Sequence, residues 1–297
     1  MVNFRKIIRK PCFLNSKNLE WHDYFYGMLT AMEIIPANEY RLLLAEVLKK
    51  SPEWIFMHLP TLVLSKQQQQ QLGALIQRRL SGEPIAKILG HKEFYGRDFF
   101  TNEHTLDPRP DSEVIIDAVK KYFSAHTFYQ ILDLGLGTGC LLFTLLCEFP
   151  KAFGIGVDCS WEALRTAKSN QEKLQLTQRS QLIQGNWAQS LHGQFDIIIS
   201  NPPYISTQEQ LDISTLHDPK IALFSGATGL EAYQEILSNI RPLLKPEGLL
   251  FLEIGKGQKT DIENIASAAG LIQKNAFADL SGIVRTLCYS SKKDKVF

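Results

Sequence analysis

The sequence has only five cysteines in 297 residues, and none of them has the spacing of a metal or redox motif. Cys12, Cys140, Cys147, Cys159 and Cys288 are scattered along the chain without a CxxC pair. This spacing argues against a zinc knuckle and against a disulfide framework. A reducing cytosol is therefore the expected location.

Long apolar runs and an excess of one charge are also missing. No apolar stretch approaches the roughly 20 residues of a membrane span, so no membrane partner is expected. The 32 Lys and Arg nearly balance the 31 Asp and Glu, whereas a protein that grips a long nucleic-acid backbone usually shows a basic field. We therefore expect no stable nucleic-acid partner.

Acidic residues are absent from the first 19 positions, which carry Arg5, Lys6, Arg9, Lys10 and Lys17. Transit peptides are basic and poor in acids, so an organellar matrix is the alternative location. The segment is short and poor in serine, however, and an ordinary basic N-terminus is the preferred interpretation.

Three regions follow one another along the chain. Residues 1–85 hold three segments with apolar residues at helical spacing, at 16–34, at 38–50 and after Ser65, and are predicted as a small helical domain. Residues 86–108 alternate glycines with short aromatic runs, which favours a hairpin linker over a helix. Residues 109–297 alternate strand and helix patterns, which predicts an α/β domain with a parallel sheet covered on both faces.

A glycine-rich turn is the first sign of a ligand site. The segment "DLGLGTG", Asp133 to Gly139, lies between a strand and a helix pattern, and its glycines allow close backbone approach to a ligand. Asp158 ends the next predicted strand, where a carboxylate can accept both hydroxyls of a ribose. The GxGxG spacing and the two acids favour S-adenosylmethionine, which carries an ammonium group, over NAD, whose pyrophosphate they would repel. An ordinary turn with a helix-capping acid is the remaining alternative.

A second polar turn follows the predicted strand "FDIIIS". Asn201, Pro202, Pro203 and Tyr204 stand at its carboxyl end, where open α/β sheets bind ligands. An amide side chain offers one acceptor and two donors, and proline holds the turn rigid. The Asn201 side-chain oxygen and the Pro202 carbonyl could then receive both hydrogens of an –NH2 group, with Tyr204 as a flat face beside it.

This arrangement suits methylation of a planar amino group. The lone pair of an amide or aryl amine is delocalised, so its nitrogen is a poor nucleophile. Holding both hydrogens fixes the plane and aims the lone pair at a methyl donor, and such orientation can lower a barrier by on the order of several kcal/mol. Neither a metal nor a strong base is needed, because the methylated amide loses its extra proton readily. The alternative is a buried proline-rich turn with a capping asparagine.

Asn-Pro-Pro-Tyr with a DxGxGTG-type loop resembles methyltransferases that act on planar amino groups of DNA, RNA or protein. The segments "GEPIAKILGHKEFYG" (82–96), "PRPDSE" (108–113), "LKPEGLLFLEIGKGQ" (244–258) and "DLSGIVR" (279–285) resemble the HemK/PrmC family more specifically. Enzymes of that family methylate the glutamine side-chain amide nitrogen in the Gly-Gly-Gln loop of peptide-chain release factors. The resemblance covers most of the chain and implies a Rossmann-like class I methyltransferase sheet with a small N-terminal helical domain joined by a β-hairpin.

The resemblance also assigns roles to individual residues. The methionine part of the cofactor would lie against the glycine loop, which consists of Gly135, Leu136, Gly137, Thr138 and Gly139. The ribose of the cofactor would bind Asp158 and its adenine would lie on Trp187. Asn201 would also contact the cofactor. The substrate glutamine would be held by Asn201, Pro202, Pro203 and Tyr204, of which Asn201, Pro202 and Tyr204 are the catalytic candidates. Phe94, Arg109 and Pro110 match positions near the pocket mouth, with a surface ion pair as the equal alternative for Arg109. The helical domain would help to recognise the release factor.

Four residues depart from the family pattern. Lys87 stands where the family usually has an aromatic, and Leu136 replaces a small or polar loop residue. Asn186 replaces a usual Asp, and Thr228 replaces an acid. The departures affect details of cofactor and substrate contacts and leave the Asn-Pro-Pro-Tyr segment intact.

Two other functions compete with glutamine methylation. One is methylation of an exocyclic base amine in RNA or DNA, which the near-neutral charge and the lack of an inserted base-recognition region disfavour, since an enzyme acting on a duplex must flip its base. The other is a binding protein that docks on a ribosome-associated partner without turnover, which the intact Asn201 to Tyr204 segment disfavours.

Overall fold

The computed structural model describes residues 35–189, 191–213 and 215–291. The helix predicted over 16–34 and the basic N-terminal segment lie outside these residues. The chain divides into two compact units, Met1–Ile88 and Leu89–Phe297, and the division falls within the segment 86–108 that was expected to be a linker.

The smaller unit is helical in its described part. It contains α2 (Ala37–Leu48), α3 (Pro52–His58), the 3-10 turn η3 (Leu59–Thr61) and α4 (Lys66–Leu80). As predicted, Ser65 begins a helix: its Oγ accepts from Gln68 N at 3.3 Å, and Gln68 Oε1 accepts from Ser65 N at 2.9 Å. This capping box satisfies two backbone donors at the helix start, so the glutamine run has a structural use. Leu43, Leu44, Ile55 and Leu72 are buried between the helices.

The connecting segment contains a short helix that the sequence pattern missed. Ile85–Leu89 form α5, where Ile88 N donates to Pro84 O and the side chains of Ala86 and Ile88 are buried. The predicted hairpin follows as β1 (His91–Phe94) and β2 (Arg97–Phe100), which pair antiparallel. Tyr95 and Gly96 form the two-residue turn with φ of 51° and 73°, as the twist of such a hairpin requires.

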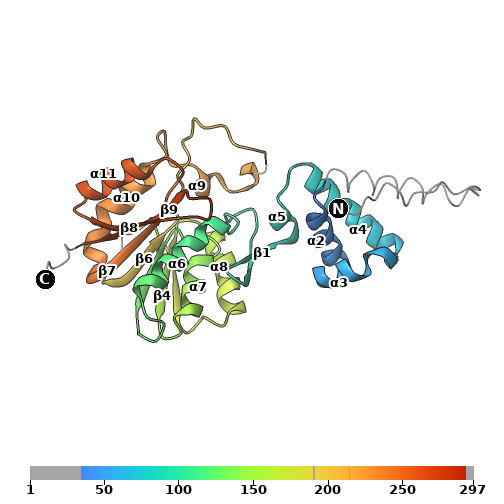
Figure 1. Ribbon diagram of the computed structural model, residues 1–297, viewed down its shortest axis with the longest axis horizontal. Helices are drawn as coiled ribbons and strands as arrows, with labels where there is room; N and C mark the ends of the chain where they lie inside the picture. Colours follow the sequence, from blue (N-terminus) through green and yellow to red (C-terminus); the bar gives the residue numbers. More distant parts are fainter. Residues whose placement is uncertain (1–34, 190, 214, 292–297) are drawn as a thin grey trace, which may run out of the picture. The chain divides into compact units, whose positions relative to one another are not determined.

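The larger unit is built on a seven-stranded sheet of order β5-β4-β3-β6-β7-β9-β8 (Figure 1). Its strands are β3 (Gln130–Leu134), β4 (Phe153–Asp158), β5 (Ser180–Gln184), β6 (Phe195–Ser200), β7 (Leu244–Glu253), β8 (Ile272–Ala278) and β9 (Val284–Ser290). The five strands from β5 to β7 are parallel, as predicted. The sheet ends with two antiparallel pairs, β7·β9 and β8·β9, which the alternating pattern did not predict.

Helices cover both faces of this sheet. The helices are α6 (Glu113–Tyr122), α7 (Cys140–Glu148), α8 (Trp161–Lys173), the short α9 (Lys220–Leu223), α10 (Glu231–Ile240) and α11 (Lys259–Ala268), with 3-10 turns η4 (Pro110–Ser112), η5 (Thr215–His217) and η6 (Arg241–Leu243). Ile197 and Ile199 of β6 pack in one core with residues of α6, α7 and α8, whereas Ile198 packs in a second core with residues of α10 and α11. This alternation is the period of a strand buried on both faces.

A buried amide fastens the hairpin to the glycine turn. Asn170 of α8 is fully buried and accepts from Phe100 N at 2.7 Å. Its Nδ2 donates to Phe100 O at 3.0 Å and to Thr138 O at 2.9 Å. One side chain of α8 therefore holds the end of β2 and the loop after β3 in fixed positions.

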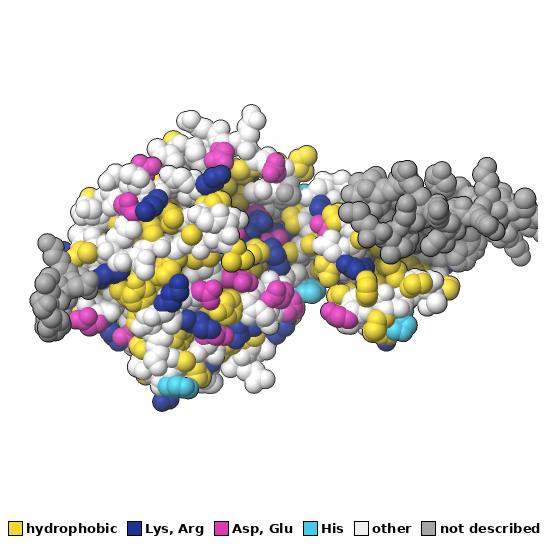
Figure 2. Space-filling view, viewed as in Figure 1, with side chains coloured by type: hydrophobic (Ala, Val, Ile, Leu, Met, Phe, Trp, Pro, Cys, Tyr) yellow, Lys and Arg dark blue, Asp and Glu magenta, His cyan; other side chains and the backbone are white. Residues whose placement is uncertain are grey.

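The surface of the larger unit mixes both charges. On its visible face in Figure 2, Lys and Arg side chains are interspersed with Asp and Glu. In the part of the chain that the structure describes, no helix has the length and apolar character of a membrane span.

Candidate active site

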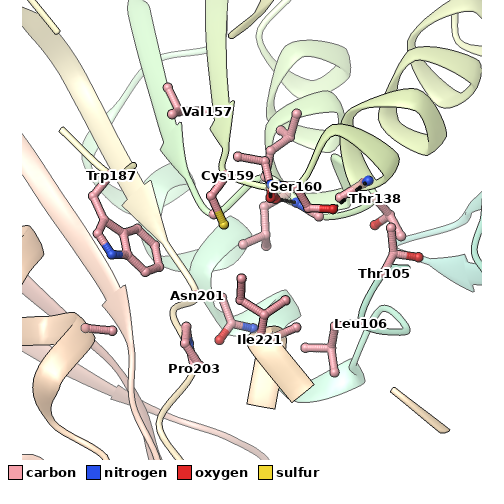
Figure 3. Close-up of a pocket in the computed structure, with 18 of the residues that line it drawn as sticks. Thr105, Leu106, Thr138, Val157, Cys159, Ser160, Trp187, Asn201, Pro203 and Ile221 are labelled. Atoms are coloured by element: carbon pink, nitrogen blue, oxygen red, sulfur yellow. Dashed lines mark hydrogen bonds between the residues drawn. The ribbon is translucent and has the colours of Figure 1, made fainter. Parts of the chain in front are cut away.

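A cavity of about 310 Å³ lies at the carboxyl ends of β3, β4 and β6. Its walls come from several segments of the larger unit: the glycine loop, the turns after β4, β5 and β6, and stretches near residues 104–112 and 221–235. Figure 3 shows Trp187, Cys159, Ser160, Asn201 and Pro203 around the same open space. The strand order places β3 between β4 and β6, and ligands of open α/β sheets bind where connections leave adjacent strands in opposite directions.

The glycine loop has a backbone that only glycine adopts readily. Gly135, Gly137 and Gly139 have φ of 82°, 56° and 78°. A Cβ on Gly135 would lie 3.1 Å from the Trp187 ring and 3.9 Å from the Asn201 carbonyl oxygen. Three of the predicted site residues, Gly135, Trp187 and Asn201, therefore lie close together, and a side chain at 135 would crowd the other two.

The side chain of Leu136 in the glycine loop packs into the protein interior. Its side chain is 4% exposed, and a Cβ on Gly156 of β4 would lie 2.6 Å from its Cδ1. The absence of a side chain at Gly156 makes room for this leucine. Leu136 is nevertheless among the residues that line the cavity.

Asp158 is held by the loop that it is expected to serve. Its carboxylate accepts from Gly137 N at 2.8 Å and from Ser160 N at 2.9 Å, one oxygen each. Burial raises the pKa of Asp158, and these two backbone donors partly offset that effect. Each oxygen keeps further acceptor capacity, so the carboxylate fits a ribose diol.

Asp133 carries a second buried carboxyl at the end of β3. Neither of its oxygens has a hydrogen-bond partner among the described residues. Burial and the charge of Asp158 raise its pKa well above the ordinary value. A positively charged ligand would favour the ionised form of both acids, whereas a pyrophosphate would add further negative charge. This end of the sheet therefore fits the sulfonium and ammonium of S-adenosylmethionine better than a pyrophosphate.

Trp187 and Asn186 form the turn after β5. Trp187 has a φ of 46° and is partly buried against the core beneath α10 and α11, while Asn186 is exposed. Trp187 lines the cavity, and Figure 3 shows its indole beside the open space. An indole has a flat surface that suits a planar ring such as adenine.

Asn201 leaves β6 with its amide fixed from one side. Its Nδ2 donates to Ser112 Oγ at 3.2 Å, and its side chain borders the cavity. The amide nitrogen is therefore engaged by the protein, and the side-chain oxygen is the group left to accept a hydrogen bond from a ligand.

The rest of the proline turn divides between cavity and interior. Pro203 lines the cavity, whereas Pro202 is buried. The ring of Tyr204 packs beside Gly255, and its carbonyl oxygen accepts from Gln258 Nε2 at 2.9 Å. Burial and the charge of Glu253 raise the pKa of the Tyr204 phenol. Gln258 thus anchors the turn from the segment after β7.

Of the three residues expected near the pocket mouth, only Arg109 lines the cavity, and Pro110 is exposed and does not line it. Phe94 is 1% exposed and packs edge-to-face on Phe99 in the core, so it does not line the cavity. Arg109 lines the cavity and donates to the buried Asp218 at 2.5 Å. The ion pair that was the alternative for Arg109 is formed, and it joins the segment before η4 to the loop that follows the proline turn.

Sequence reasoning missed two residues behind Asn201. Ser112 and Glu253 are both 3% exposed. Asn201 Nδ2 donates to Ser112 Oγ, and the Glu253 carboxyl lies beside both side chains, with its Oε2 left without a hydrogen-bond partner among the described residues. Burial raises the pKa of Glu253 to about 7, against the lowering effect of the neighbouring Ser112 and Asn201 side chains. The available signal was an acid that ends the apolar run "GLLFLE".

Comparison with known proteins places the chain in a family. A family model of the PrmC N-terminal domain matches residues 28–90, and a model of the methyltransferase small domain matches residues 106–218. The release factor glutamine methyltransferase of Agrobacterium fabrum is 38% identical over 86% of this chain and 90% of its own length. The chain belongs to the release factor glutamine methyltransferase family. This is the HemK/PrmC resemblance predicted from the sequence.

The chain is also similar to longer proteins that are named bifunctional methyltransferases. The bifunctional methyltransferases of Rickettsia felis and Rickettsia typhi are 37% and 40% identical over 85% of this chain. The chain spans about half the length of these relatives, 54% and 53%.

Solved structures confirm the predicted fold class. The hMettl16 catalytic domain in complex with a 3′UTR hairpin has a TM-score of 0.55 at 14% identity, covering 72% of this chain and 84% of that one. A methyltransferase from Pyrococcus furiosus has a TM-score of 0.51 at 18% identity, covering 72% and 96%. Family and fold support S-adenosylmethionine as the cofactor, and the donor set around Asp158 and the glycine loop fits it.

Proposed function

We propose that this chain transfers the methyl group of S-adenosylmethionine to the side-chain amide nitrogen of the glutamine in the Gly-Gly-Gln motif of peptide chain release factors. The observation that carries the proposal is the position of Asn201, whose side chain borders the same cavity as the glycine loop. Membership in the release factor glutamine methyltransferase family supports the choice of substrate.

The cofactor side of the cavity is made by three segments. The backbone of Gly135 to Gly139 can approach the methionine part, Asp158 can accept the ribose hydroxyls, and Trp187 offers its face to the adenine. Bound S-adenosylmethionine supplies a methyl group made electrophilic by its sulfonium.

The substrate side is made by Asn201 and the turn after it. The Asn201 side-chain oxygen, with the Pro202 carbonyl, accepts the two hydrogens of the glutamine –NH2 group and sets the plane of the amide. An amide held in this way keeps its nitrogen lone pair directed at the methyl group. The entropy cost of orienting the two reacting groups is then met before the reaction begins. Tyr204 supports the turn from the interior side, and Arg109, paired with Asp218, borders the entrance.

Methylation of a base amine in RNA or DNA is the alternative that we do not favour. The interspersed charges on the visible surface (Figure 2) lack the basic stripe of a nucleic-acid groove. On our proposal the protein has no stable nucleic-acid or membrane partner and works where release factors work, in the cytoplasm or an organellar matrix. The helical unit, residues 1–88, contributes to recognition of the release factor.

A transfer assay with methyl-tritiated S-adenosylmethionine tests the proposal. We expect label in purified release factor, at the Gly-Gly-Gln peptide after digestion, and none in total RNA. A release factor with Gln→Ala in that motif is the matched control and should take up no label. Label in RNA only, or label that survives the Gln→Ala change, would overturn the proposal.

A further inference from the structure

The amide of Asn201 can face the cavity in either of two orientations, and only one suits the substrate. With the oxygen toward the cavity it accepts a hydrogen bond from the glutamine –NH2, and with the nitrogen toward the cavity it presents donors to donors. Rotation by 180° about the last side-chain bond interchanges the two. Something behind Asn201 must therefore decide which orientation is populated.

The groups behind Asn201 form a short chain of side chains. Asn201 Nδ2 donates to Ser112 Oγ at 3.2 Å. A serine hydroxyl that accepts one bond still has its own hydrogen to donate, and the neighbouring acceptor is the carboxyl of Glu253. Both Ser112 and Glu253 are buried, so water does not compete for these bonds.

We propose that Glu253 is a positioning residue that sets the orientation of the Asn201 amide through Ser112. A carboxylate can only accept hydrogen bonds, so the Ser112 hydroxyl donates to it and the Asn201 nitrogen donates to Ser112. The Asn201 oxygen is then left toward the cavity. This inference rests on the proposed function and adds to it a residue that does not touch the substrate.

Protonation of Glu253 removes this constraint. A neutral carboxyl carries its own O–H, which can donate to Ser112 Oγ, and the Ser112 hydroxyl can then donate to a flipped Asn201 oxygen. Burial raises the pKa of Glu253 to about 7, so both protonation states are accessible near neutral pH. The oriented state is the ionised one and is populated above that pKa.

The neighbouring groups of Glu253 whose pKa values are shifted do not titrate in the same range. Burial raises the pKa of Cys140 of α7 to about 12, and the pKa values of Tyr204, of Tyr233 of α10 and of Arg285 of β9 are also raised. Asp111 of η4 is paired with Arg285 at 2.7 Å. Tyr233 donates to the backbone oxygen of Glu253 at 2.9 Å, so its hydroxyl hydrogen is not used on the carboxyl, whose Oε2 has no hydrogen-bond partner among the described residues.

The test compares Glu253→Gln with wild type and with Glu247→Gln, an exposed acid on the same strand. Single-turnover methylation of release factor is measured at saturating S-adenosylmethionine between about pH 6 and 8, on either side of the Glu253 pKa. We expect the wild-type and Glu247→Gln rates to rise with pH around 7. The Glu253→Gln rate should be lower by about tenfold at the upper end and flat with pH, and calorimetry should show unchanged cofactor affinity.

A binding-independent readout follows the amide itself. In NMR spectra of protein labelled with 15N-asparagine, the two side-chain amide signals of Asn201 are identified as those missing in Asn201→Ala. These signals should shift with an apparent pKa near 7 in wild type and should not titrate in Glu253→Gln. Ser112→Ala, a smaller change, should likewise lower the single-turnover rate without weakening cofactor binding.

The outcomes separate this inference from the proposed function. No release-factor methylation by wild type would defeat the proposed function. Methylation by wild type together with wild-type rates and pH dependence in Glu253→Gln would defeat only the inference. If Glu253→Gln does not fold, wild-type rates in Ser112→Ala and an Asn201 side chain that does not titrate would defeat it equally.

Discussion

At the scale of single residues, Asn201 and Asp158 line the same cavity but are held by the protein in different ways. Asn201 is fixed by its nitrogen, so its oxygen is offered to a ligand. Each carboxylate oxygen of Asp158 accepts one backbone hydrogen bond, from Gly137 N or Ser160 N, so each oxygen has a further lone pair that can accept a hydrogen bond from a ligand. The first residue is expected to act on the nucleophile and the second on the cofactor.

Replacing Asn201 by Ala should lower turnover far more than cofactor affinity. The substrate amide would lose its acceptor, and an unpaired buried donor costs roughly 1–3 kcal/mol. With the lost alignment, the single-turnover rate should fall by about two orders of magnitude. Asn201→Asp keeps an acceptor and should lie between Ala and wild type. A wild-type rate in Asn201→Ala with collapsed S-adenosylmethionine affinity would make Asn201 a cofactor ligand only.

Replacing Asp158 by Ala should weaken S-adenosylmethionine binding in a protein that stays folded. Each hydrogen bond to a charged group contributes about 1.5–3 kcal/mol, and the Gly137 amide would also lose its acceptor. Isothermal calorimetry measures the affinity and circular dichroism the fold, with Asp158→Asn as the variant that retains one acceptor. Unchanged affinity in folded Asp158→Ala would rule out the ribose assignment.

How far the site could be predicted depends on where its residues lie in the sequence. The glycine loop, Asp158 and the Asn-Pro-Pro-Tyr segment follow predicted strands directly, so their place at one edge of the sheet was predictable. Ser112 and Glu253 meet only because η4 and the end of β7 come together in three dimensions. Phe94 has the right neighbours in the sequence, but its strand turns it into the core.

At the scale of elements, α8 does more than cover the sheet, because its Asn170 joins two other elements. The parallel strands and their helices could be predicted from alternating patterns. The contact of β2 with the loop after β3 could not, since it depends on one buried amide between segments far apart in the chain. The antiparallel β8 and β9 escaped prediction because strand patterns do not carry strand direction.

Asn170→Ala should destabilise the larger unit and loosen the glycine loop. Three backbone groups, on Phe100 and Thr138, would lose their partner, at a cost of about 1–3 kcal/mol for each that remains unsatisfied. Urea unfolding should show the loss, and calorimetry should show weaker S-adenosylmethionine binding. Ser169→Ala on the exposed side of the same helix is the control and should change neither. Unaltered stability in Asn170→Ala would contradict the fastening role.

At the scale of the whole molecule, the chain consists of two units with separate cores. The cavity is lined by residues of the larger unit alone. Cofactor binding is therefore expected to need only that unit, while recognition of a protein substrate is expected to need both.

Deleting residues 1–80 should leave S-adenosylmethionine affinity largely intact and impair methylation of intact release factor. The deletion stops where α4 ends and keeps β1 and β2, which pack on the larger unit. A short Gly-Gly-Gln peptide serves as the control substrate, because it offers nothing for the helical unit to recognise. Equal turnover of truncated and full-length enzyme on whole release factor would contradict the recognition role.

The pH dependence of stability should carry the signature of Glu253. Its folded pKa of about 7 lies above the ordinary value of 4.5, so the folded state binds more protons between these values and stability falls as pH rises through this window. The difference corresponds to about 3 kcal/mol. In urea unfolding, Glu253→Gln should match wild type near about pH 5 and exceed it near about pH 8. Parallel curves for the two proteins would refute the assignment.

The pairing of Leu136 with Gly156 couples two positions that lie in different segments of the chain. A Cβ at 156 would lie 2.6 Å from Leu136 Cδ1 and 2.7 Å from Cδ2, so a side chain at 156 and the leucine at 136 compete for the same space. The leucine would have to move to make room. The effects of substitutions at these two positions are therefore not expected to add.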